Sequence, residues 1–255
     1  MSTRILLTTF MLIGLAAPTS AQRQIERDLF VAAAASLSGL APTLSQALHA
    51  ETGIDVRFNF AGSNTLARQI VEGARVDVFI SADEAQMNVV ENAGRVVAGT
   101  RADIVSNQLV VIVNAESRGA LQSPDDLRHA SIRRLAMGDP AAVPAGVYGR
   151  QWLESVRVWN DVAAKVVPLP SSPSVVAALR EGRADAGIVY ASDPLPSNLR
   201  VAYAVPVEDA PRIVYPAAAI VGGRIPIARD FIAWLRSATA RRLFEAAGFR
   251  APVSR

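Results

Sequence analysis

The sequence feature that most constrains the fold is a repeated unit: a short apolar run passes through a small serine-containing turn into an amphipathic stretch. Residues 56–60 alternate apolar and polar side chains with the period of two typical of a strand. Leu66 and Ile70 then follow a helical period, and Ser63 or Asn64 can cap the first turn. We expect a strand that ends at a helix N-terminus, where free backbone N–H groups and a partial positive charge attract anions.

The same unit recurs in two other places. Residues 29–35 lead through Ser36 into a stretch with helical spacing, and residues 76–80 lead through Ser81 into another. The first run is apolar throughout, which is typical of a buried strand in a parallel sheet covered by helices on both faces. The residues alone favour Ser81 as a helix cap, and they favour a core position for Tyr190, which closes a further apolar run.

Two later turns also lead into predicted helices. Proline and glycine leave the backbone N–H groups of Ala145 and Gly146 unobstructed at the start of one predicted helix. The next predicted helix has Ser172 as its N-cap and Pro173 at its first position, where proline is favoured. The turn at Ala145 and Gly146 is therefore a further candidate anion site.

The order of strands and helices predicts an α/β protein with two lobes. Strands and helices alternate throughout, and two extended segments, residues 104–113 and 212–221, can cross between the lobes. The predicted division is residues 22–105 plus 214–255 for lobe I and residues 106–213 for lobe II. The chain is 51% hydrophobic, which is enough for one large core or two medium cores.

Residues 1–21 have the composition of a signal peptide. Arg4 precedes an apolar run, and the small residues that end at Ala21 suit cleavage after that position. The apolar run is too short for a membrane anchor, which needs about 20 apolar residues. The sequence contains no cysteine, which excludes disulfides, thiolate metal sites and a lipid anchor on an N-terminal cysteine. We expect export to the periplasm through a cleavable signal peptide.

Charge and motif content argue against two other functions. The formal net charge is +3, or about +2 without Arg4, and the pairs Arg133-Arg134 and Arg241-Arg242 are too sparse for a nucleic-acid track. The only histidines are His49 and His129, and the sequence has no Gly-x-Ser-x-Gly elbow, Walker loop or HExxH motif. A hydrolytic enzyme is therefore the weakest alternative, and we expect no nucleic-acid partner.

Five blocks, in the same order and over nearly the whole mature chain, resemble the periplasmic molybdate-binding proteins of ABC transporters. They are residues 30–37, 60–69, 77–83, 138–140 with 143–146, and 187–190. The resemblance implies a type II periplasmic binding protein, in which two α/β lobes are joined by two crossing strands. The ligand of that family is a tetrahedral oxyanion, bound in the cleft between the lobes.

The resemblance also implies the site residues. Lobe I would contribute hydroxyl and N–H donors, and lobe II would contribute two backbone N–H groups and a phenol. The implied set is Ser36, Ser63, Ala145, Ser172 and Tyr190. Ser174 is the alternative to Ser172, because this segment matches the family less well.

The implied ligand is molybdate or tungstate, and metal would be bound only as the oxyanion, with no other cofactor. Implied partners are a membrane permease and an ATPase, and we expect a monomer whose lobes close on the ligand. A pocket that contains only donors should reject phosphate, which retains a proton at neutral pH, provided that Asp83 and Asp139 point away. A sulfate-like oxyanion or another small solute on the same fold is the alternative ligand.

Overall fold

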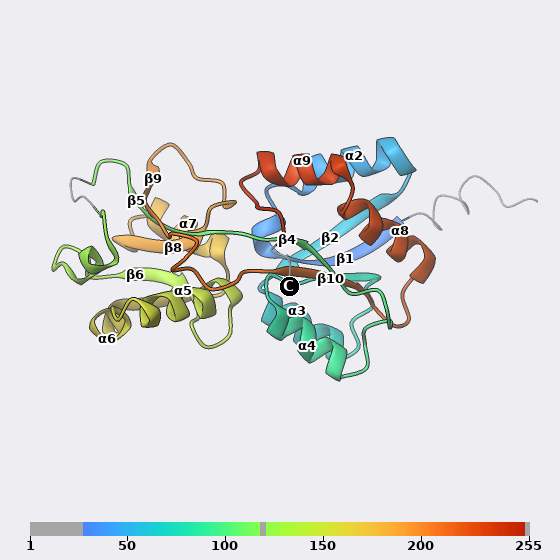
Figure 1. Ribbon diagram of the computed structural model, residues 1–255, viewed down its shortest axis with the longest axis horizontal. Coiled ribbons are helices and arrows are strands. Elements are labelled where there is room, and N and C mark those ends of the chain that lie inside the picture. The colour runs from blue at the N-terminus through green and yellow to red at the C-terminus, as the bar shows by residue number, and fades with distance from the viewer. Residues whose placement is uncertain (1–27, 118–120, 253–255) are drawn as a thin grey trace, which may run out of the picture.

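The computed structural model describes residues 28–117 and 121–252, which form two lobes lying side by side (Figure 1). Each lobe is built on a five-stranded sheet. The predicted class of two α/β lobes is confirmed, but both sheets are mixed, whereas the apolar run at 29–35 predicts parallel ones. The expected signal peptide, residues 1–21, lies outside the described residues.

Lobe I contains the sheet with strand order β2-β1-β3-β10-β4. Its strands are β1 (Asp28–Ala34), β2 (Asp55–Ala61), β3 (Val78–Ile80), β4 (Ala102–Val105) and β10 (Tyr215–Ala219). Its helices are η1 (Ala35–Leu37), α2 (Ala41–Thr52), α3 (Ser63–Val71), α4 (Glu84–Asn92), α8 (Ile225–Leu235) and α9 (Ala238–Ala246). Strands β1, β2 and β3 are parallel, whereas β10 enters on the chain's return from lobe II and is antiparallel to β3 and β4. Helices α3 and α4 cover one face, and α2, α8 and α9 cover the other (Figure 1).

Lobe II contains the sheet with strand order β7-β6-β8-β5-β9. Its strands are β5 (Leu109–Asn114), β6 (Leu135–Gly138), β7 (Val166–Leu169), β8 (Ala186–Tyr190) and β9 (Leu199–Ala204). Its helices are η2 (Pro124–Arg128), α5 (Pro144–Ser155), α6 (Trp159–Val162), η3 (Ala163–Lys165) and α7 (Ser172–Arg180). Both α5 and α7 begin just after a parallel strand, so their N-termini lie at the carboxyl end of the sheet.

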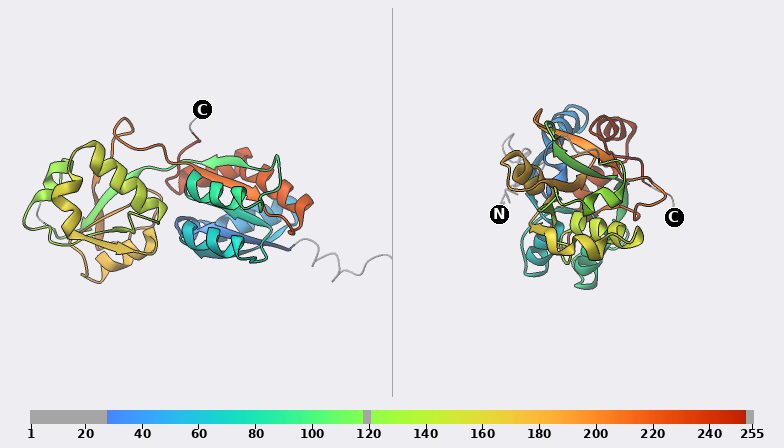
Figure 2. Two further views of the ribbon diagram at one scale, coloured as in Figure 1. Left: turned by 90° about the horizontal axis from the view of Figure 1, so that it is seen from below. Right: turned by 90° about the vertical axis from the view of Figure 1, so that its left-hand side faces the viewer.

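Two segments connect the lobes, and both pass from one lobe to the other in the same region (Figure 2). The continuous strand predicted over residues 104–113 is instead two strands, because β4 pairs in lobe I, β5 pairs in lobe II, and residues 106–108 lie between them. Residues 205–214 form the return segment. Ser106 also pairs with Arg250, so the C-terminal segment joins this junction.

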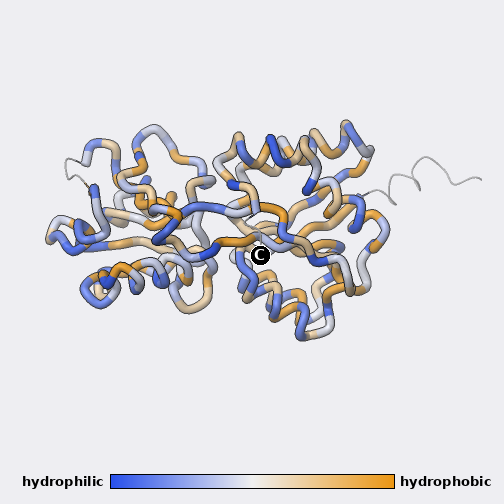
Figure 3. The backbone as a smooth tube through the Cα atoms, viewed as in Figure 1, coloured by the Kyte–Doolittle hydropathy of each residue, from blue (hydrophilic) through white to orange (hydrophobic). Residues whose placement is uncertain are grey.

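The apolar core follows the central strands of both sheets (Figure 3). Strands β3, β8 and β10 are buried along their whole length, since helices cover both faces. Trp152 of α5 and Phe231 of α8 are among the largest fully buried side chains. Within the described part of the chain, no helix has the length and apolar character needed to cross a membrane.

Candidate functional site

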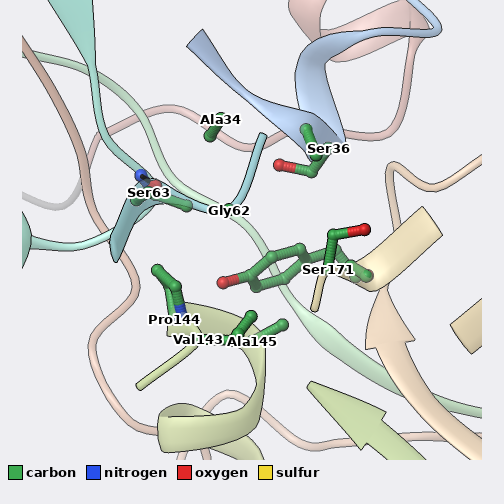
Figure 4. A pocket seen from close by; sticks show the side chains of 12 residues that line it. Ala34, Ser36, Gly62, Ser63, Val143, Pro144, Ala145 and Ser171 are labelled. Carbon is green, nitrogen blue, oxygen red and sulfur yellow. Dashed lines mark hydrogen bonds between the residues drawn. The ribbon is translucent and has the colours of Figure 1, made fainter. Parts of the chain in front are cut away.

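A small pocket lies between the two lobes and encloses about 230 Å³ of free space, its open mouth included. It is lined by Ala34, Ala35, Ser36, Gly62, Ser63, Ala82, Val143, Pro144, Ala145, Ser171, Ser172 and Tyr190. All five predicted site residues are in this set. Figure 4 shows the lobe I serines Ser36 and Ser63 facing Val143, Pro144 and Ala145 across the pocket. The fold therefore brings together predicted site residues that are up to 154 positions apart in the sequence, from Ser36 to Tyr190.

Ser63 is the first residue of α3 and is 1% exposed. Its Oγ accepts a hydrogen bond from the backbone N–H of Ala82 at 2.9 Å. The prediction that Ser63 or Asn64 caps the helix is wrong, because Gly62 is the N-cap and no side chain caps this end. The N–H of Thr65 donates to the Gly62 carbonyl at 3.0 Å, whereas the first two N–H groups of the helix, those of Ser63 and Asn64, have no helical acceptor and are left for a ligand.

Ser36 lies in η1, directly after β1, and is 5% exposed. Its Oγ is 2.9 Å from the hydroxyl oxygen of Tyr215, the first residue of β10. Burial raises the pKa of Tyr215 far above its ordinary value, so this phenol stays neutral. Ser36 therefore lines the pocket and is hydrogen-bonded on its other side to a neutral phenol.

The N-terminus of α5 supplies the predicted main-chain donor Ala145. Pro144 occupies the first helical position and Ala145 the second, where a backbone N–H has no helical acceptor. The N–H of Gly146, also predicted to be unobstructed, instead donates to the carbonyl of Val143 at 2.8 Å. A β-carbon on Gly146 would collide with the Gly138 carbonyl, so glycine allows α5 to dock against the end of β6.

The N-terminus of α7 supplies the second main-chain donor. Ser171 is the N-cap, not Ser172 as predicted, and its Oγ accepts the N–H of Ser174 at 3.3 Å. Ser172 is therefore the first helical residue, with its N–H lacking a helical acceptor. Ser174, the alternative donor, does not line the pocket and has its N–H engaged by Ser171.

Tyr190 ends β8 and is 2% exposed. Its hydroxyl is buried and has no hydrogen-bond partner among residues 28–117 and 121–252. Burial raises the pKa of this phenol well above its ordinary value, so it is a neutral O–H donor. The core position that the residues alone favour is confirmed, since the Tyr190 ring packs in the core and edge-on to the ring of Tyr215, and the same side chain also lines the pocket.

Sequence reasoning missed Asp193, which lies directly behind the pocket. Its Oδ2 accepts hydrogen bonds from the Ser172 hydroxyl and from the backbone N–H of Tyr190, the latter at 2.9 Å. Burial raises the pKa of this carboxyl to about 6. No sequence signal marked this residue, because its partners come from two other elements.

The pocket lining carries no charged side chain among the described residues. Asp83 faces its own helix, where it is the N-cap of α4 and accepts the N–H of Gln86 at 2.8 Å; the predicted cap, Ser81, bonds to Asp83 instead. Asp139 accepts the N–H of Ala141 at 2.9 Å. Nowhere in the described ranges do three His, Cys, Asp or Glu side chains gather as a metal ion would need.

Comparison with known proteins identifies the family. The profile described as bacterial extracellular solute-binding protein matches residues 29–250. The chain belongs to this family. Molybdate-binding protein ModA of Escherichia coli (strain K12) is 32% identical to this solute-binding protein over 229 residues, which cover 88% of this chain and 89% of the relative. The resemblance seen in the sequence is thereby confirmed, as is a binding role in transport rather than an enzymatic one.

Solved structures agree with this assignment. The periplasmic molybdate-binding protein of Azotobacter vinelandii has a TM-score of 0.78 and 25% identity, covering 88% of this solute-binding protein and 100% of that chain. The sulfate-binding protein SubI from Mycobacterium tuberculosis H37Rv has a TM-score of 0.77 and 17% identity, and the match covers 89% of this chain and 87% of SubI. At this identity the likeness shows the fold alone. The family description places such proteins outside the cytoplasm.

Proposed function

We propose that this solute-binding protein captures molybdate, or tungstate, in the periplasm and delivers it to the permease and ATPase of an ABC transporter. The observation that carries the proposal is the character of the pocket: the polar side chains lining it are all hydroxyls, and none is charged. Relatives of the chain are named for binding molybdate, which supports this choice of oxyanion.

A buried dianion must be matched by donors, because its desolvation otherwise defeats binding. The pocket offers the hydroxyls of Ser36, Ser63 and Tyr190 and first-turn N–H groups of α3, α5 and α7. Each hydrogen bond to a charged acceptor contributes about 1.5–3 kcal/mol, and the positive ends of three helix dipoles add to this. Uncharged donors from both lobes can therefore hold the ion without an arginine or lysine.

We also propose that the lobes close around the ligand and that the protein acts as a monomer. Ser36 and Ser63 come from lobe I, whereas Ala145, Ser172 and Tyr190 come from lobe II, so a bound ion would link the two halves. Residues 1–21 would act as the cleaved signal peptide that exports the chain.

Calorimetric titration of the mature protein with molybdate, tungstate, sulfate and phosphate tests the proposal. We expect tight binding of molybdate and tungstate, weaker binding of sulfate and no binding of phosphate. Ser63→Ala should weaken molybdate binding by about 10- to 100-fold because it removes one charged-acceptor hydrogen bond. Ser174→Ala, which removes a neighbouring hydroxyl that does not line the pocket, should change it less than threefold. Preference for sulfate or phosphate over molybdate would contradict the proposal.

A further inference from the structure

A buried chain of hydrogen bonds runs from Ser36 in the pocket to the junction between the lobes. The hydroxyl oxygen of Tyr215 is 2.9 Å from Ser36 Oγ and 3.2 Å from Nδ2 of Asn107. The same Nδ2 is 2.8 Å from Oγ of Ser192, which follows β8 in lobe II. All four side chains are at most 8% exposed, so water does not compete for these bonds.

Asn107 sets the direction of donation along this chain. Its Oδ1 accepts the backbone N–H of Gln108 at 2.9 Å, and since a backbone N–H can only donate, Nδ2 must be the donating end. Nδ2 then donates to the Tyr215 oxygen, and the hydrogen of Tyr215 is left to donate to Ser36. The reverse arrangement, with Ser36 donating to Tyr215, would leave a buried phenolic hydrogen without an acceptor, which is costly.

We propose that Asn107 and Tyr215 are positioning residues that make Ser36 an obligate hydrogen-bond donor toward the pocket, so that the site selects oxyanions without a proton. Ser36 receives the hydrogen of Tyr215, and its own hydrogen is therefore directed at the ligand. Ser63 is held in the same way by the N–H of Ala82. This inference rests on the proposed function, and it assigns the discrimination against protonated oxyanions to residues outside the pocket lining.

Asn107→Asp at pH 8 tests the direction of donation. An ionised carboxylate can only accept, so the hydrogen of Tyr215 would turn toward it and Ser36 would donate to Tyr215. Ser36 would then offer a lone pair to the pocket, which disfavours molybdate and suits the proton of hydrogen phosphate. We expect molybdate binding to weaken at least tenfold and the ratio of phosphate to molybdate dissociation constants to fall at least tenfold.

Gln108→Glu is the matched control for added charge. Gln108 is the next residue, but its side chain bonds to the Val205 carbonyl at 2.7 Å and to Arg250, not to Tyr215. This control should weaken the binding of molybdate and phosphate by similar factors and leave the ratio of their dissociation constants unchanged. If it lowers the ratio as much as Asn107→Asp does, charge alone explains the effect and the inference is overturned.

A double-mutant cycle with Ser36→Ala separates positioning from a structural role. If Asn107 acts through Ser36, Asn107→Asp should change the selectivity ratio less than twofold in the Ser36→Ala background. An equal change in both backgrounds would overturn the inference. Should Asn107→Asp fail to fold by circular dichroism, the cycle is run with Tyr215→Phe, whose loss of affinity should likewise vanish without the Ser36 hydroxyl and would contradict the inference if it persisted.

The wild-type titration separates this inference from the proposed function. Wild-type protein that binds none of the tested oxyanions would overturn both. If the wild type binds molybdate but the effects of Asn107→Asp and Ser36→Ala simply add, only the positioning role of Asn107 and Tyr215 is overturned.

Discussion

Gly62 of lobe I and Pro170 of lobe II lie so close across the cleft that a β-carbon built on Gly62 would come within 2.7 Å of the Pro170 carbonyl oxygen. The other atom near that position, Oδ1 of Asn64, belongs to a side chain that can rotate. Gly62 has φ −58° and ψ 139°, which any residue adopts, so its importance comes from space and not from backbone strain. The arrangement of the lobes seen here requires a glycine at this position.

Gly62→Ala should therefore impair closure while leaving each lobe folded. We expect molybdate affinity to fall at least tenfold and the unfolding free energy of the ligand-free protein to change by less than about 1 kcal/mol. Calorimetry and urea unfolding give the two quantities. Small-angle scattering should show that molybdate compacts the wild type but not the variant.

Gly39→Ala is the matched control for this prediction. It also adds a methyl group between the lobes, but 3.2 Å from Cγ of Pro194 and with no backbone atom in the way. Its effect on affinity should be clearly smaller. Unchanged affinity and ligand-induced compaction in Gly62→Ala would show that the close approach is not needed for binding.

Tyr190→Phe should separate binding from stability. The Tyr190 hydroxyl is buried without a partner in the described residues, so its removal ends a desolvation cost in the ligand-free state. We expect the unfolding free energy of the free protein to stay constant or rise by up to about 1 kcal/mol, while molybdate affinity falls about 10- to 100-fold.

Tyr148→Phe provides the contrast for that measurement. The Tyr148 hydroxyl is bonded to the backbone of Val214 and does not line the pocket, so its loss should lower stability by about 1 kcal/mol. Urea unfolding of the two variants compares them directly. A stability loss in Tyr190→Phe as large as in Tyr148→Phe would mean that the Tyr190 hydroxyl has a partner in the free protein.

Asp193 should make stability depend on pH. Burial raises its folded-state pKa to about 6 from an ordinary value of 3.8, so the folded protein holds this proton over a range in which the unfolded chain has lost it. The stability contributed by the protonated form is complete below about pH 4 and is lost as the pH rises to about 6, by up to about 3 kcal/mol.

Asp193→Asn removes this titration and leaves an oxygen that can still accept from Ser172 and Tyr190. The unfolding free energy of the wild type minus that of the variant should fall between pH 4 and pH 6 and stay flat above. Urea titrations across this range measure the difference, and groups common to both proteins cancel. A difference that rises with pH would show that the carboxyl is stabilised in its charged form.

Much of the site could be predicted from the sequence, because its residues sit in local units. Ser36, Ser63 and Ala145 each lie where a strand leads into a helix, and such units repeat along the chain. The residue that caps α7 was harder to predict. In residues 171–174, Ser171 and Ser172 can each act as the N-cap, because proline is tolerated at either of the first two helical positions. The hydrogen bond from the Ser174 N–H to Ser171 Oγ shows that Ser171 is the N-cap of α7.

Long-range partners could not be predicted in this way. Asn107 and Tyr215 are 108 residues apart, and Asp193 reaches Ser172 on another element. Their contacts depend on how the two lobes pack, which no local pattern encodes. The antiparallel course of β10 was missed for a similar reason, because an apolar run indicates burial but not the direction from which the chain returns.

Anomalous diffraction at the molybdenum edge, from crystals grown with molybdate, would locate the bound ion and its ligands directly. We expect one strong peak between the lobes, with oxyanion oxygens about 2.7–3.2 Å from the hydroxyls of Ser36, Ser63 and Tyr190 and from the backbone nitrogens of Ala145 and Ser172. A peak elsewhere on the molecule, or an arginine guanidinium in contact with the ion, would contradict this expectation.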